Sequence, residues 1–116
     1  MRIYTSDQFE LPVPVGHRFP MAKYRLLRER VEAIAAHLQA ELIEAPRAED
    51  EAVLRVHTAD YVNRVHEGTL SEAEQRRIGF RWSPAMAERT RRVSGATMAA
   101  LASAIDGCGV GVNLAG

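Results

Sequence analysis

Residues 15–25 read Val-Gly-His-Arg-Phe-Pro-Met-Ala-Lys-Tyr-Arg and mark the point where a loop becomes a helix. Gly16 gives the loop backbone freedom, and Pro20 suits a first helical turn, where the backbone N–H has no helical partner. Downstream, apolar side chains recur at steps of three and four residues, which predicts one buried face on a helix from Pro20 to about Ala40. This apolar stripe consists of Tyr24, Leu27, Val31, Ile34 and Leu38.

Arg25 adjoins the stripe, so the pattern places a cation at the start of this helix. A buried guanidinium needs a partner, because an unpaired buried charge is costly. Spacing alone favours a surface or salt-bridged arginine over a functional one.

Three short strands are predicted around this helix. They are Arg2–Ser6, Glu41–Ala45, which stops at Pro46, and Val110–Leu114. The order strand, helix, strand predicts parallel pairing of the first two strands. Gln8–Arg18 has no helical period, and a loop of this length is either functional or loosely ordered.

Local signals predict further helices in the second half of the chain. Small side chains dominate the last of these helices, which predicts that its axis lies close to a sheet or another helix. The signals are a short helix in Ala48–Val56, a Thr58 cap for a helix ending at Gly68, a Ser71/Glu74 capping box, and a helix from Ser83-Pro84 to Asp106-Gly107.

Composition bounds the class of protein. The 116 residues make one domain at most, and 15 basic and 15 acidic side chains cancel. This balance argues against a general nucleic-acid binder. The cluster Arg89, Arg91 and Arg92 is interpreted as a solvated helix face that is ion-paired with Glu88.

The cellular compartment is predicted from two further features. A single cysteine, Cys108, excludes an internal disulfide and suits a reducing compartment. No apolar run approaches the length of a membrane span, and the N-terminus lacks a secretory signal. We therefore expect a cytoplasmic protein with no membrane partner.

The residues alone predict no catalytic constellation. The histidines show no metal-ligand spacing, and there is no glycine-rich phosphate loop between a strand and a helix. Ser94-Gly95 lies within a helix, so it is not a nucleophile elbow. The four histidines are His17, His37, His57 and His66.

Several motifs, in order along the whole chain, resemble the histone deacetylase family, and its bacterial members most. The first half of the match lies in the opening loop and helix, and the second half near the C-terminus. The matching residues are Gly16-His17, Pro20-Met21, Lys23-Tyr24-Arg25, His57 to Tyr61, Gly95-Ala96-Thr97, Ile105-Asp106-Gly107 and Val110 to Gly116.

The resemblance implies an α/β fold: a three-layer αβα sandwich with a parallel sheet, known as the arginase/deacetylase fold. Residues 1–116 would be a single incomplete domain, the N-terminal part of that fold, with about three strands plus helices. The first strand would lie between the second and the third. The third strand would keep one edge bare, and a bare edge favours self-association.

The resemblance also implies an activity. Family enzymes use Zn²⁺ to polarise an acetamide carbonyl while a histidine deprotonates the attacking water. The substrate would be an acetylated amine such as acetyl-lysine or an acetylpolyamine. The His-His dyad and the zinc ligands of the family fall after residue 116, so we expect no cofactor in this chain and no activity from it alone. A truncated, non-catalytic binding or interaction module and a plain α/β scaffold are the alternatives.

The resemblance assigns site residues one by one. Arg25 matches an arginine of the internal channel that can hold an acetate-like anion, and His17 matches a histidine in the loop at the channel mouth. Gly116 matches the first of the glycines before the dyad. Trp82 would help form a pocket rim, where eukaryotic members place an acidic residue that grips the substrate backbone. No catalytic residue and no metal ligand is assigned to this chain.

Overall fold

A computed structural model describes residues 1–115 of the protein. The predicted strands are confirmed, each with bounds within one residue of those expected. The elements in chain order are β1 (Arg2–Thr5), α1 (Ala22–Ile34), β2 (Glu41–Glu44), α2 (Asp50–Leu54), α3 (Ala59–Glu67), α4 (Glu72–Ile78), α5 (Pro84–Asp106) and β3 (Gly111–Asn113).

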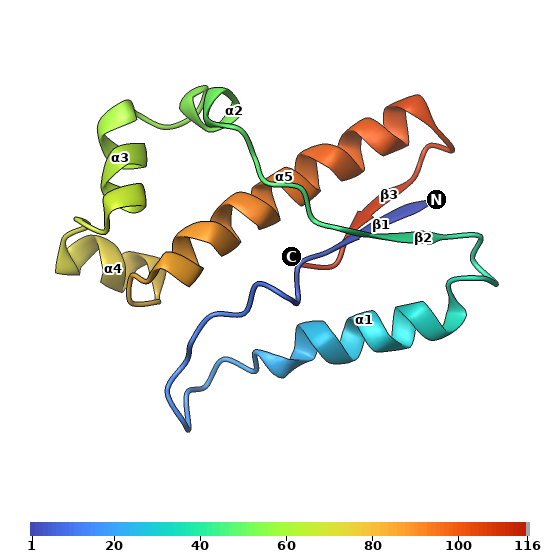
Figure 1. Ribbon diagram of the computed structural model, residues 1–116, viewed down its shortest axis with the longest axis horizontal. Coiled ribbons are helices and arrows are strands. Elements are labelled where there is room, and N and C mark those ends of the chain that lie inside the picture. Colours follow the sequence, from blue (N-terminus) through green and yellow to red (C-terminus); the bar gives the residue numbers. More distant parts are fainter. Residues whose placement is uncertain (116) are drawn as a thin grey trace.

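The strands form one parallel sheet in the order β2-β1-β3. Ile3 in the central strand lies opposite Leu42 on one side and Val112 on the other. Figure 1 shows the sheet between α5 and α1. This α/β arrangement, with β1 in the centre, confirms the expected sandwich architecture and strand order.

The core lies between the sheet and α5. Tyr4 packs there with Ala45, Ala96 and Ala100, and its hydroxyl is 2.7 Å from the Ser103 hydroxyl on α5. Small side chains permit this approach, because close packing leaves no room for larger ones. The predicted close contact of the small-residue helix with a sheet is therefore confirmed.

Two glycines set the distance between α5 and its neighbours. A Cβ atom at Gly95 would overlap the carbonyl group of Pro46, which follows β2. A Cβ atom at Gly111 in β3 would overlap the carbonyl group of Ala100 on α5. Backbone therefore meets backbone on both flanks of the helix.

The first helix is shorter and less buried than predicted. It ends at Ile34. After this point the chain turns toward β2: Gln39 has a positive φ of 50°, and the Ala40 N–H donates to the Ala35 carbonyl. Tyr24 is buried and Val31 is half-buried, but the other members of the stripe are exposed in residues 1–115. Leu27, Ile34 and Leu38 are 43%, 50% and 40% exposed.

Helices α2 to α4 form a group over the first half of α5 (Figure 1). The predicted caps are confirmed: the Thr58 and Ser71 side chains accept from the N–H groups of Tyr61 and Glu74, and Gly68 ends α3 with φ 77°. Helix α2 is shorter than the predicted Ala48–Val56, since it covers only residues 50–54.

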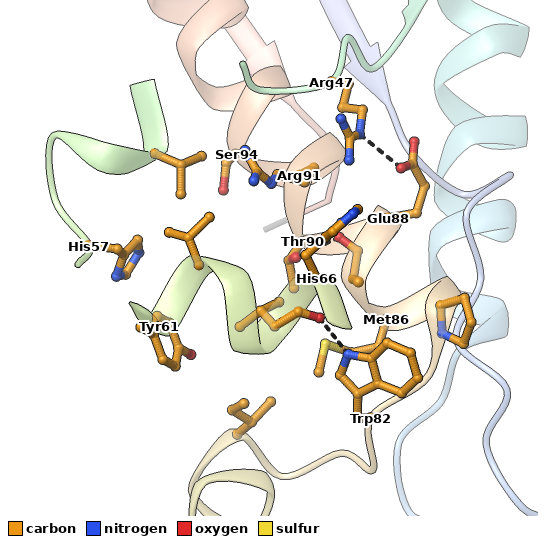
Figure 2. A pocket seen from close by; sticks show the side chains of 16 residues that line it. Arg47, His57, Tyr61, His66, Trp82, Met86, Glu88, Thr90, Arg91 and Ser94 are labelled. Atoms are coloured by element: carbon orange, nitrogen blue, oxygen red, sulfur yellow. Dashed lines mark hydrogen bonds and ion pairs between the residues drawn. The ribbon is translucent and has the colours of Figure 1, made fainter. Parts of the chain in front are cut away.

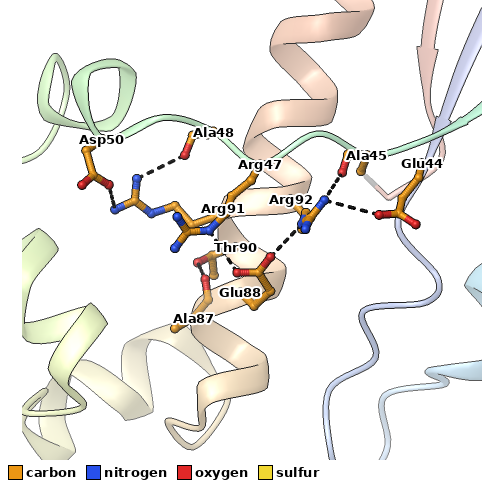
Figure 3. Close-up of polar contacts among 10 residues, drawn as sticks. All are labelled: Glu44, Ala45, Arg47, Ala48, Asp50, Ala87, Glu88, Thr90, Arg91 and Arg92. Atoms are coloured by element: carbon orange, nitrogen blue, oxygen red, sulfur yellow. Dashed lines mark hydrogen bonds and ion pairs between the residues drawn. The ribbon is translucent and has the colours of Figure 1, made fainter.

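Three arginines correct the interpretation of a solvated helix face. Arg92 donates to the Ala45 carbonyl at 2.9 Å and to Glu88 at 2.7 Å. Arg91 donates to the Ala48 carbonyl at 3.3 Å and pairs with Asp50 (Figure 3). The pairing with Glu88 was predicted correctly, but these side chains hold the segment after β2 against α5. The third arginine, Arg89, is buried.

Candidate functional site

The loop that follows β1 is held by Arg89 of α5. This side chain is 6% exposed, and its Nη1 donates to the carbonyl oxygens of Ser6 (3.1 Å) and Phe9 (2.9 Å). Its guanidinium carbon lies 4.4 Å from the centre of the Tyr24 ring. One buried cation thus joins the start of the loop that carries His17 to the first turns of α1.

The far end of this loop meets the loop between α4 and α5 through aromatic side chains. His17 stacks on Phe80 with ring centres 5.9 Å apart, and Phe19 meets Phe80 edge-on at 5.2 Å. Lys23 Nζ lies 4.7 Å from the Phe19 ring centre and 4.8 Å from that of Tyr24. The ring pairs with Phe80 join two loops that are distant in sequence, and the cation–π contacts of Lys23 hold the end of the first loop against the start of α1.

His17 lies exposed at this junction. Its Nδ1 accepts a hydrogen bond from the Phe19 backbone N–H at 3.1 Å, which leaves Nε2 free to carry the proton of the neutral ring. The side chain is thereby oriented by its own loop and by Phe80.

Arg25 lies on the exposed surface of α1. It donates to Glu29 at 2.9 Å, one helical turn further on, and its side chain is 48% exposed. An exposed pair of this kind contributes little, so the guanidinium keeps donors for an anion. The structure thus places Arg25 in the salt-bridged surface position that its spacing favoured.

Trp82 lies beside a cavity between α3 and α5. Its indole Nε1 donates to the Val65 carbonyl at 2.6 Å, and its backbone N–H donates to the Gln75 side chain at 2.8 Å. A Cβ atom at Gly68 would lie 2.8 Å from the indole ring. Trp82 therefore ties the α4–α5 loop to α3 and also forms a wall of the cavity (Figure 2).

Three of the four residues that the resemblance singled out lie in the described part of the chain, and they make no direct contact with one another. Within residues 1–115, no hydrogen bond or ring contact joins His17, Arg25 and Trp82 to one another. The fourth, Gly116, lies outside the described residues. His17 is linked to Trp82 indirectly: it stacks on Phe80, and Phe80 and Trp82 lie in the same loop between α4 and α5.

The residues present do not fit a zinc ion. Nowhere in the part of the chain that the structure describes do three or more His, Cys, Asp or Glu side chains gather as a metal site would need. None of the helices within residues 1–115 is long and apolar enough to cross a membrane.

A network of charged groups lies at the start of α4. Arg64 donates to Glu74, and this contact, with hydrogen bonds from the Ser71 backbone and hydroxyl, lowers the pKa of Glu74 to about 2. On α5, the hydrogen bond from Arg92, helped by Arg47, lowers the pKa of Glu88. Both carboxylates are therefore charged at neutral pH.

Sequence reasoning missed the buried position of Arg89, although a signal was present. Counting along α5, Met86, Arg89, Ala96 and Ala100 are separated by three, seven and four residues, so they share one helical face. All four are buried. The helical phase of Arg89 with respect to the small residues indicates that it points to the core.

Comparisons with known proteins agree with this geometry. The Histone deacetylase domain matches residues 17–115. An uncharacterized protein of Picosynechococcus sp. (strain ATCC 27264 / PCC 7002 / PR-6) is 37% identical over 115 residues, which are 98% of this chain and 37% of that protein. The chain thus spans little more than a third of the length of this relative.

Proposed function

The chain belongs to the histone deacetylase family, and from this premise we propose that it supplies the N-terminal strands and helices of a zinc-dependent deacetylase. The observation that carries the proposal is the domain match over residues 17–115. The parallel β2-β1-β3 sheet supports it, because this is the strand order that the family fold implies. The substrate would be an acetylated amine, such as acetyl-lysine or an acetylpolyamine.

In this proposal, residues 1–115 contain neither the zinc ligands nor the groups that move protons. Two observations support this division. The chain spans 37% of the relative's length, and residues 1–115 gather no metal-ligand set. When bound, zinc would polarise the carbonyl of the acetyl group. The chain's own contribution is positional: Arg89 fixes the loop that carries His17, and the aromatic contacts with Phe80 fix its outer end.

The roles of the predicted site residues are part of the proposal. His17 would line the channel mouth, Trp82 would form a rim, and Gly116 would lead toward the catalytic dyad. Arg25 would hold the acetate-like product, which its exposed guanidinium supports. We also place the protein in the cytoplasm.

A zinc titration with an acetyl-lysine peptide and an acetylpolyamine tests the division of labour. The chain alone should release no acetate at any zinc concentration. A chimera, in which this chain replaces the matching 115 residues of the Picosynechococcus protein, should release acetate only with metal, as should that protein itself. Metal-dependent turnover by the chain alone would show that the ligand assignment is wrong. An active relative with a folded but inactive chimera would contradict the shared function.

A non-catalytic binding module is the second candidate, and the free donors of Arg25 favour it. Acetate binding by the chain alone, lost in Arg25→Ala and kept in the matched surface variant Arg30→Ala, would support this candidate. Absence of acetate binding would remove it.

Self-association is a further part of the proposal. Within the described sheet β3 pairs only with β1, and large apolar side chains are exposed on α1 and α5. An unpaired edge and uncovered apolar surface favour association. Sedimentation should show mass rising with concentration, and a monomer at high concentration would contradict this.

A further inference from the structure

The cavity between α3 and α5 has the size and lining of a ligand site. Its volume is about 420 Å³. Sites for small ligands usually measure roughly 300–1,000 Å³ and are mostly apolar, with a few polar groups at fixed points. Neither His17 nor Arg25 lines this cavity, and Trp82, the proposed rim residue, is the one proposed site residue that it shares.

Apolar side chains from several elements line much of the cavity. Val53 comes from α2, Val62 and Val65 from α3, and Met86 from α5. Trp82 lies beside Met86 in the wall of the cavity (Figure 2). Such a surface favours an aliphatic or aromatic body over a polar one.

Positive charge gathers at the opposite side. Figure 2 shows Arg47 and Arg91 along the upper edge of the cavity, across from Trp82. Glu88 is the one acidic residue of the lining. Its carboxylate accepts from Arg47 of the lining (3.0 Å) and also from Arg92 (2.7 Å), which does not line the cavity, so Arg47 shares this carboxylate with a second guanidinium.

The remaining partner of Arg91 is replaceable. Arg91 Nη2 lies 2.7 Å from Asp50, whose side chain is largely exposed, whereas the Arg91 side chain is mostly buried. An exposed carboxylate contributes little to such a pair, because water solvates it equally well. A ligand carboxylate that enters with an apolar body would compete with Asp50 at this position.

We propose that this cavity binds an amphiphilic monocarboxylate, with its apolar body against Trp82 and the valines and its carboxylate at Arg91 and Arg47. The proposal rests on charge complementarity and cavity lining and does not depend on deacetylase activity.

Fluorescence of Trp82, the single tryptophan of the chain, reports on this cavity directly. Octanoate, octylamine and octanol have chains of the same length and differ in the head group. We expect a saturable change in Trp82 emission with octanoate. Octylamine should bind at least about tenfold more weakly, because a charge-assisted hydrogen bond contributes about one to two powers of ten in affinity. Equal affinities for octanoate and octanol would overturn the assignment of an anion.

Matched variants on α5 locate the site. Ser94 lines the cavity and is exposed, so Ser94→Phe should fill it and abolish the octanoate response without disturbing the core. Met98→Phe, an exposed position outside the lining, should leave the response unchanged. A response that survives in Ser94→Phe, or no saturable response in the wild type, would overturn the proposal.

Arg91→Gln tests the charge, with an expected loss of about tenfold in octanoate affinity and no change for octanol. Should this variant unfold in circular dichroism, the Ser94/Met98 pair and the three head groups still decide the outcome. Because the readout is binding by the chain alone, a failure here leaves the acetate-release test of the proposed function unaffected.

Discussion

The sheet with α5 and the helices around it are held by different forces. Between α5 and the sheet, backbone approaches backbone at Gly95 and Gly111, and the side chains between them are small and buried. Helix α1 carries the apolar stripe that is apparent in the sequence, but most of that stripe stays half-exposed. Helices α3 and α4 depend on Thr58, Ser71 and ion pairs at their surface. An apolar stripe therefore identifies a helix, while small residues identify the helix that the sheet buries.

Gly95→Val should produce the largest effect, because the added side chain would overlap the carbonyl group of Pro46. We expect a loss of about 3 kcal/mol in the free energy of unfolding, measured with urea. Ala33→Val, an exposed position on α1, should cost at most about 0.5 kcal/mol, as β-branching costs on a helix surface. Similar losses in the two variants would remove the distinction between the helices.

Arg89→Met should cost about 2 kcal/mol, because the carbonyl oxygens of Ser6 and Phe9 would lose a buried donor. Arg25→Met removes an exposed pair with Glu29 and should change the free energy of unfolding by less than about 0.5 kcal/mol. Thermal and urea unfolding of both variants check this. An unaffected Arg89→Met protein would show that the loop after β1 is held by other contacts.

Ser71→Ala removes the capping box of α4, in which the Ser71 hydroxyl accepts from the Glu74 N–H. Loss of such a cap costs about 1 kcal/mol. Amide exchange in residues 72–78 should accelerate while exchange in α5 stays unchanged, because α4 is held locally. Equal acceleration in both helices would mean that they unfold as one unit.

The acid response of α4 follows from Glu74. The pKa of Glu74 is lowered to about 2 by Arg64 and by Ser71, below its ordinary value of 4.5. A lowered pKa in the folded state stabilises the fold above the unfolded-state value, and this contribution is lost as the pH falls from about 4.5 toward 2. Carbon chemical shifts of the carboxyl group should titrate near pH 2, and Glu74→Gln should remove this part of the acid dependence. A midpoint near 4.5 would show that the Arg64 contact is not formed in solution.

Ile34→Ser should have the smallest effect on the stability of the isolated chain. Its side chain is half-exposed, so little apolar burial is lost, and we expect a change within about 0.5 kcal/mol. Sedimentation of the same variant should show weaker self-association. A large loss of stability would mean that α1 is covered in solution.

The sequence predicts correctly those features that depend on contacts between residues close together in the chain. Thr58, Ser71 and Ser83 were identified as caps because a cap contacts a backbone N–H only three residues away. The strands were placed within one residue for a similar reason, since turns and Pro46 bound them locally. Their order in the sheet came from the family resemblance, because short-range patterns do not specify which strand lies in the centre.

The errors concern residues whose state depends on distant partners. The prediction of a solvated Arg89 is wrong, since its acceptors lie about 80 residues earlier in the chain and only its helical phase points inward. The end of α1 was placed too late, because apolar periodicity continues to Leu38 while the backbone turns at Gln39 to enter β2. For the candidate site, the sequence singled out His17, yet its contact with Phe80 required the fold.

Amide hydrogen exchange of the intact 116-residue chain, resolved by residue with NMR, tests the central claim that the sheet and α5 form the stable body of this chain while α1 lies beside it uncovered. We predict that the slowest amides lie in β1 and in residues 95–103 of α5, and that amides of α1 exchange at least about tenfold faster, as expected for a helix with few buried contacts. Protection of α1 equal to that of α5 would contradict the account.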